Sequence, residues 1–90
     1  MRNRTFKLPA VIDAGSAGEV REALLKLRGA NLKLDASDVR RIGGLGLQIL
    51  LAAGRQWRTD GAKFAIVKPS EAFTDLMRLM GAADQLELSA

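Results

Sequence analysis

Short segments along the chain carry the apolar patterns that are typical of strands. Residues 5–8 alternate weakly between apolar and polar, which predicts a half-exposed strand that Pro9 ends or confines to a sheet edge. Residues 32–34 alternate in the same way, with two leucines on one side. Residues 63–67 contain an apolar run that suits a strand covered on both faces. Residues 86–88 give a weaker pattern for a final short strand.

A first helix is indicated by apolar residues that recur with helical spacing after the first strand. Ser16 and Glu19 match a capping box, and Asp13 is the rival N-cap. The helix is therefore expected to begin at Asp13 or Ser16 and to run to Leu27, with Gly29 placed to stop it. Its apolar face comprises Val20, Ala23, Leu24 and Leu27.

A third helix is expected near the end of the chain. Ser70 is its predicted N-cap, and Glu71 lies in the first turn, where the helix dipole favours negative charge. Gly81 is expected to end it. Its apolar face comprises Phe73, Leu76, Met77 and Met80.

The central segment joins the second strand to a helix through a polar loop and a glycine-rich turn. Three polar residues end the strand: Asp35, Ser37 and Asp38. Gly43, Gly44 and Gly46 are expected to let the backbone turn tightly into the helix. The helix should end at Asp60-Gly61. Its apolar face comprises Leu47, Leu50, Leu51 and Gly54.

This order of strands and helices predicts an α/β fold, with residues 1–90 forming a single small domain. Right-handed crossovers favour a mixed, mostly parallel sheet of four to five strands with three to four helices. Each helix should contribute one residue to the centre of the core. These residues are Leu24, Leu50 and Met77, and they should pack on Leu32, Leu34, Phe64 and Ile66.

Composition narrows the chemistry that this domain can perform. The chain has no Cys, His or Tyr, so the commonest general base, the commonest metal ligand and any thiolate nucleophile are missing. We therefore expect no metal and no other cofactor. No apolar run approaches the roughly 20 residues of a membrane span, and the basic N-terminus lacks the apolar stretch of a signal peptide. A cytoplasmic location without membrane insertion is expected.

The net charge of +4 comes from basic residues that are spread along the chain. Nucleic-acid binding would require a denser basic stripe, with aromatic residues on which bases could stack. No nucleic-acid partner is therefore expected, and the basic surface is interpreted as solvated.

The glycine cluster is the main candidate for chemistry in this sequence. It matches neither the dinucleotide fingerprint nor the P-loop, so a nucleotide- or anion-binding domain is the weaker alternative. Asp35 and Asp38 precede a helix, where such residues usually serve as turn and capping groups rather than as an acid–base pair. We assign no catalytic residue and do not expect an enzyme.

Taken together, these motifs resemble the STAS family, the domain shared by sulfate transporters and anti-sigma-factor antagonists. The segment from Asp35 to Leu51 carries Asp-Ala-Ser-Asp-Val at a strand end, then Arg-Arg-Ile, a glycine-rich turn and Gly-Leu-Gln-Ile-Leu-Leu. Residues 8–13 and 69–81 also resemble short bacterial members, so the resemblance covers nearly the whole chain. It implies a mixed sheet with helices against it and a protein-binding role.

Regulated members of the family carry a Ser or Thr at the start of the central helix, which a partner kinase phosphorylates. An ungapped match from Asp35 places Gly44 at this phospho-acceptor position, and the other alignment places Ile42 there. Neither residue has a hydroxyl, and residues 38–58 contain no Ser or Thr. The usual phosphorylation switch is therefore not expected here. Ser37 is the nearest hydroxyl, and we expect it to accept hydrogen bonds from turn N–H groups.

The partner-binding site is expected on the loop and on the exposed side of the central helix. Val39 and Ile42 should point inward, which forces Arg40 and Arg41 outward as a pair. Glycines at the helix start would leave N–H groups open to a partner. Alternatively, the arginines are only solvated and the glycines only make the turn. The expected site residues are Asp38, Arg40, Arg41, Gly43, Gly44, Gln48 and Arg55.

The resemblance leaves the identity of the partner protein open. One interpretation is a bacterial regulatory module that binds an anti-sigma factor (itself a kinase) or a chemotaxis component. The alternative is the small STAS subunit of a phospholipid-transport ABC complex, which docks on the ATPase. The sequence also leaves a homodimer open.

Overall fold

A computed structural model gives the fold and describes residues 2–81 and 88–89. Four strands form the main sheet in the order β1-β3-β5-β6, and every pair of neighbours is parallel. The strands are β1 (Asn3–Lys7), β3 (Asn31–Asp35), β5 (Phe64–Val67) and β6 (Leu88–Ser89). The weakly indicated last strand is thus present at Leu88, whereas residues 86 and 87 lie outside the described residues.

A second, two-stranded parallel sheet lies apart from the first and was not predicted. It pairs β2 (Val11–Ile12) with β4 (Arg41–Ile42). Two residues are too few to show a period along the sequence, so no pattern could indicate these strands. Their pairing fixes the loop after β3 next to the loop before the first helix.

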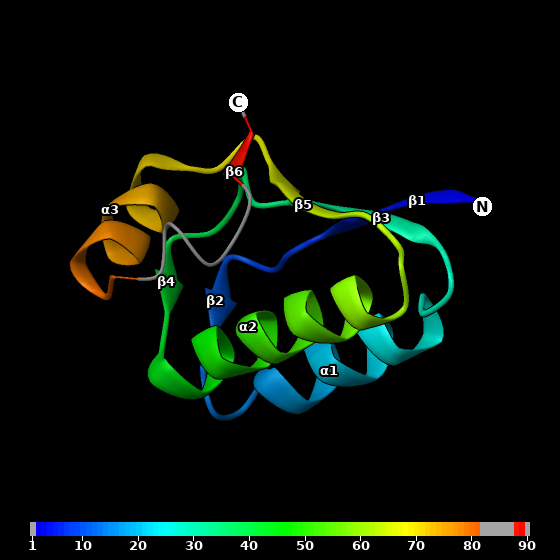
Figure 1. The fold of residues 1–90 in the computed structure, drawn as a ribbon. Coiled ribbons are helices and arrows are strands. Elements are labelled where there is room, and N and C mark those ends of the chain that lie inside the picture. Colours follow the sequence, from blue (N-terminus) through cyan, green and yellow to red (C-terminus); the bar gives the residue numbers. More distant parts are fainter. Residues whose placement is uncertain (1, 82–87, 90) are drawn as a thin grey trace.

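Three helices complete the expected α/β fold, and they are α1 (Ala17–Lys26), α2 (Gly44–Thr59) and α3 (Glu71–Leu79). Figure 1 shows α1 and α2 side by side against one face of the main sheet, with α3 set beside β4. None of the described helices combines the length and the apolar character that crossing a bilayer requires.

The core lies between the main sheet and the helices, as predicted. Leu24, Leu50 and Met77 are all buried and belong to one apolar cluster with the expected strand residues. Burial alternates along β3 and β5, so only one face of the sheet is fully covered. The expectation that β5 is covered on both faces is therefore wrong: Ala65 and Val67 remain half-buried. The placement of Met80 in the apolar face of α3 is also wrong, since it is 46% exposed.

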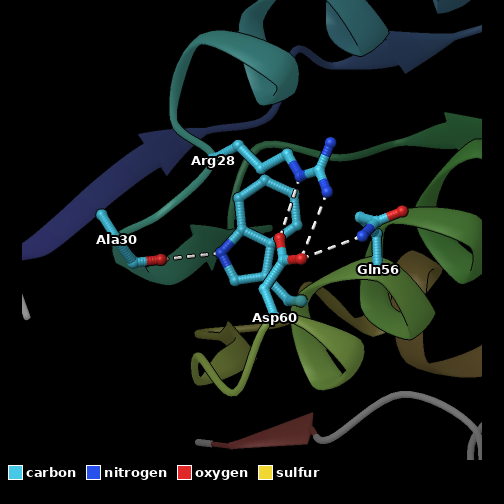
Figure 2. Close-up of polar contacts among 5 residues, drawn as sticks. Arg28, Ala30, Gln56 and Asp60 are labelled. Carbon is cyan, nitrogen blue, oxygen red and sulfur yellow. Dashed lines mark hydrogen bonds and ion pairs between the residues drawn. The ribbon is translucent and has the colours of Figure 1, made fainter.

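The ends of α1 and α2 are tied together by polar contacts around a buried tryptophan. The indole Nε1 of Trp57 donates a hydrogen bond of 2.7 Å to the carbonyl of Ala30. Figure 2 shows Arg28 and Gln56 converging on the carboxylate of Asp60. Arg28 donates through Nε at 2.9 Å and through Nη2 at 3.2 Å, and the Gln56 amide donates at 3.0 Å. These contacts fix the α1–β3 connection against the end of α2.

Hydrogen bonds at the helix starts separate the correct capping predictions from the wrong one. Ser70 caps α3 as expected, because its Oγ accepts from the N–H of Phe73. The capping box at Ser16 is wrong: Ser16 precedes α1 but makes no side-chain capping bond, and its Oγ donates to Val11 instead. The carboxylate of Asp13 accepts from two N–H groups of this turn, those of Gly15 and Ser16. Asp13 therefore organises the entry to α1.

Candidate partner-binding site

The loop after β3 begins with a turn that Asp35 holds together. Its Oδ1 accepts the backbone N–H of Ser37 at 2.9 Å and the hydroxyl of Ser37 at 2.6 Å. These two hydrogen bonds, the side-chain bond first, lower the pKa of Asp35 below its usual value. The expectation that the Ser37 hydroxyl accepts from backbone N–H groups is wrong, because this hydroxyl donates to the carboxylate. Asp35 and Ser37 thus have a structural role in the turn.

Val39 and Ile42 anchor the loop as predicted, and both are buried. Between them, the backbone N–H groups of Arg40 and Arg41 donate to the carbonyl of Ala10, at 2.7 and 3.2 Å. Both arginine side chains are exposed. The β2–β4 pairing therefore presents the arginine pair on a fixed backbone.

Asp38 and Arg40 face a broad hollow between this loop and the start of α3. The hollow is also lined by Ser37, Ser70 and Glu71. Asp38 is exposed and lies 3.3 Å from the Nζ of Lys7, a surface ion pair that contributes little to stability. Asp38 and Arg40 are thus together on one side of the loop.

Arg41 belongs to β4 and pairs with Val11 of β2, two residues before Asp13. Its guanidinium makes a minor contribution to the lowered pKa of Asp13, which arises mainly from the hydrogen bonds that Ser16 and Gly15 donate to this carboxylate. Sequence reasoning treated Asp13 only as a cap and missed this neighbour of the candidate site. The two residues are far apart in sequence, and only the β2–β4 pairing brings them together.

The start of α2 carries no side-chain cap and no acidic residue in its first turn. Gly43 is the extended N-cap residue, with φ −86° and ψ 173°, and both Gly43 and Gly44 are exposed. A Cβ atom added at Gly44 would meet nothing within 4 Å. Leu45 follows and is 50% exposed, an apolar member of this surface that lies off the predicted helix face and was missed.

The glycines at this helix start have different roles from the one predicted. None of Gly43, Gly44 and Gly46 has a positive φ, so the turn does not depend on glycine conformations. Gly46 is instead required by close packing: an added Cβ would lie 2.6 Å from Cγ2 of Ile12 and 3.0 Å from its carbonyl oxygen. Gly44 is under no such constraint, which leaves an open, side-chain-free surface at the position aligned with the phospho-acceptor.

Gln48 and Arg55 extend the candidate site along α2, and both are exposed. Gln48 is one turn beyond Gly44, whereas Arg55 lies about 16 Å from it along the helix axis, at roughly 1.5 Å per residue. Gln48 thus lies within one turn of Gly44 on α2, and Arg55 lies at a distance from both.

The charged side chains of this surface are exposed, and none of them is buried. Among residues 2–81, no polar or charged residue is buried, and no buried side-chain N or O atom lacks a hydrogen-bond partner. The described part of the chain contains no group of His, Cys, Asp and Glu side chains that could hold a metal ion. The arrangement consists of exposed arginines, a carboxylate and open helix N–H groups.

A small α/β fold with such a loop at the start of its central helix is typical of the class of STAS domains. The chain belongs to the family described as Mlab, STAS domain, whose model matches residues 4–88. No curated protein sequence matches the chain significantly.

Solved structures support the same fold. A crystal structure of a proposed anti-sigma factor antagonist from Thermotoga maritima is similar, with a TM-score of 0.79 and 18% identity over 92% of this chain and 75% of that one. An NMR structure named for the same Thermotoga protein gives a TM-score of 0.79 and 17% identity, over 96% of this chain and 72% of that one. The anti-sigma factor antagonist SpoIIAA in its unphosphorylated form gives a TM-score of 0.74 and 11% identity, over 99% of this chain and 81% of that one.

Proposed function

We propose that this protein is a cytoplasmic, non-enzymatic module that binds a protein partner without being switched by phosphorylation. The observation that carries this proposal is the open start of α2, where Gly44 stands at the aligned acceptor position and nothing fills the space beside it. A hydroxyl is absent from the whole of residues 38–58. The partner would therefore meet the same surface at all times.

The charge and exposure of the loop support a partner with an acidic contact surface. Arg40 and Arg41 are both exposed, and their backbone is held by Ala10, so the partner need not order the loop. Arginine side chains are favoured at interfaces because their planar donors can bind a carboxylate through two hydrogen bonds. Open N–H groups at the start of α2 could donate further hydrogen bonds to carboxylate or carbonyl oxygens of the partner.

Two kinds of partner remain as candidates. Anti-sigma factor antagonists are among the similar structures, which supports an anti-sigma factor or a related signalling protein, including a chemotaxis component, as the partner. The alternative partner is the ATPase of a phospholipid-transport ABC complex, to which the chain would bind permanently as a subunit. The missing hydroxyl supports this alternative, because a permanent subunit needs no phosphorylation switch.

Affinity capture from the native host with the full chain as bait tests the proposal. Arg41→Glu and Gly44→Asp should each weaken capture of the identified partner tenfold or more, about 1.4 kcal/mol, with little change in melting temperature. Arg58→Glu and Gly18→Asp are matched controls, since Arg58 is exposed elsewhere on α2, and Gly18 is exposed with nothing within 4 Å of an added Cβ. Recovery of an ATPase, a kinase or a chemotaxis protein distinguishes the candidates.

Unchanged binding by both site variants would place the partner on another surface. Mass spectrometry of the bait chain after capture provides the second readout. It should find no phosphate within residues 38–58, and stoichiometric phosphate on Ser37 would show that the acceptor has moved rather than disappeared.

A further inference from the structure

The two neighbouring helices α1 and α2 leave an apolar groove between them that the candidate site does not use. Its hollow has a volume of about 230 Å³ and is lined by apolar side chains from both helices, with the buried ring of Trp57 at its base. The apolar lining residues are Leu24, Leu25, Ile49, Ala52, Ala53 and Trp57. None of the seven candidate site residues lines it.

Apolar side chains continue from this hollow onto the exposed surface. Leu25 lies in the lining and is 46% exposed. Leu45 is 50% exposed and precedes Ile49 by four residues, so the two share a face of α2. From Ile49 to Trp57 the α2 side of the hollow extends about 12 Å, which is roughly two helical turns. The groove therefore has the length and the apolar character that are needed to bind one short helix.

One end of the groove is rigid before anything binds. Trp57 donates a hydrogen bond to the carbonyl of Ala30, and Arg28 and Gln56, which both line the hollow, donate hydrogen bonds to Asp60 (Figure 2). A preformed pocket loses little side-chain freedom on binding, which favours affinity. An apolar cavity of roughly 150 Å³ can hold a benzene ring, so this hollow has room for one large side chain.

Charge identifies the kind of segment that fits. The lining contains two arginines, Arg21 and Arg28, and no carboxylate. Arg28 is already bound to Asp60, whereas the nearest approach of Arg21 to a carboxylate is 3.9 Å, to Glu22, with both side chains largely exposed. A second copy of this chain, with its net charge of +4, would bring like charge to this rim. A carboxylate beside Arg21 would be favourable.

We propose that the α1–α2 groove binds an amphipathic helix of a partner protein, which inserts a leucine or aromatic side chain into the hollow and places carboxylates beside Arg21. This is a second contact surface, which differs from the arginine loop and the open N–H groups of α2 and meets the candidate site only at Leu45. Binding through a helix laid into a groove uses apolar anchors at i, i+3, i+4 and i+7, and the length of the groove accommodates such a set.

The experiment titrates the full, isotopically labelled chain with a synthetic helical peptide and follows backbone amide shifts. The probe is an amphipathic peptide of about 12 residues, long enough for three turns, with leucines at the four anchor positions and glutamates elsewhere. Its counterpart carries lysines in place of the glutamates. The acidic peptide should shift amides along both sides of the groove and should bind at least about tenfold more tightly than the lysine peptide.

Two groove variants and one matched control decide the outcome. Arg21→Glu should remove the preference for the acidic peptide, and Leu25→Glu should abolish binding of both peptides. Leu79→Glu makes the same change at a leucine of α3 that is 82% exposed, and it should bind like the parent. Gly44→Asp should also leave peptide binding unchanged, which separates this groove from the proposed loop site.

Three results would overturn the inference. These are no amide shifts in the groove, equal binding of the two peptides, and retention of binding by Leu25→Glu. Sedimentation of the free chain as a dimer that Leu25→Glu dissociates would show that a second copy occupies the groove instead. If the chain binds anionic lipid vesicles and the vesicles prevent the peptide from binding in the groove, the groove would be a membrane-binding surface instead.

Discussion

Gly46 shows how one missing side chain can determine how closely two elements approach. It lies in the first turn of α2, and the nearest atoms to a Cβ at this position belong to Ile12 and Ile42. Both isoleucines are buried in the small β2–β4 sheet. The helix start can therefore contact this sheet directly only because residue 46 has no side chain.

Replacing this glycine tests the close contact. Gly46→Ala should lower the free energy of unfolding by about 1–3 kcal/mol through overpacking, an effect that the better helix propensity of Ala offsets by up to about 1 kcal/mol. Gly44→Ala is the control, because its Cβ meets nothing, and it should leave stability unchanged or slightly raised. Urea denaturation of the two variants and the parent measures the difference. Equal stabilities would mean that Ile12 can move aside without cost.

At the scale of elements, α2 performs three tasks on different parts of its surface. Leu50 packs into the core, the first turn presents the open N–H groups beside Gly44, and Ile49 and Ala53 line the groove. Because these tasks use different residues, substitutions can separate stability from binding.

The core face of α2 should dominate stability. Leu50 is fully buried, so Leu50→Ala should cost about 2–5 kcal/mol, the range observed for truncating buried leucines. Leu45→Ala makes the same truncation at a half-exposed site and should change stability by no more than about 0.5 kcal/mol. Thermal and urea unfolding of both variants provide the comparison. A loss well under 1 kcal/mol for Leu50→Ala would contradict the placement of this residue at the centre of the core.

Regular elements were predictable because their apolar residues repeat over several turns or strand residues. The residues Leu24, Leu50 and Met77 followed from the helical period, and the inward direction of Val39 and Ile42 followed from their apolar character. The strands β2 and β4 could not be predicted from the sequence, because each is fixed by a partner strand far away in sequence. Capping was predictable only in part, since Ser16 and Asp13 offered the same local signal and only the folded turn selects between them.

At the scale of the whole molecule, exposed carboxylates make the free energy of unfolding depend on pH. Asp60 accepts hydrogen bonds from Arg28 and Gln56, and these bonds, that of Arg28 first, lower the pKa of Asp60 below its ordinary value of 3.8. A carboxyl group with a lowered pKa in the folded chain binds fewer protons than it does in the unfolded chain. Its stabilising effect is therefore complete above the unfolded pKa and is lost as the pH falls through the folded pKa.

An acid titration of stability tests this linkage. The parent should lose more stability than Asp60→Asn when the pH falls below about 3.8, because the neutral amide of this variant has no charge to lose. Asp75→Asn removes the same charge on α3 and should keep the acid dependence of the parent. The measurement is the urea midpoint at a series of pH values. Parallel curves for the parent and Asp60→Asn would show that the Arg28–Asp60 pair does not contribute.

The candidate surfaces were predictable only where they are local in sequence. The loop from Asp38 to Gly44 is continuous, so its exposed arginines could be anticipated. The proximity of Asp13 to Arg41 and the groove between Leu25 and Ile49 each join distant segments, and they exist only once the sheets place those segments together. No period or motif within one segment predicts its contact with the other.

The wholly parallel pairing of the described strands has a consequence for how the chain reaches this fold. Asn3 pairs with Asn31 and Leu32 pairs with Phe64, so each step of the main sheet must enclose a helix and cannot begin from a hairpin. Such long-range pairing slows folding, because the conformational entropy of the enclosed loop is lost before the strand contacts form and stabilise the chain. During synthesis, β1 must wait unpaired until β3 has left the ribosome. The basic residues Arg4 and Lys7 on this strand are placed to oppose its association with other unfinished chains in that interval.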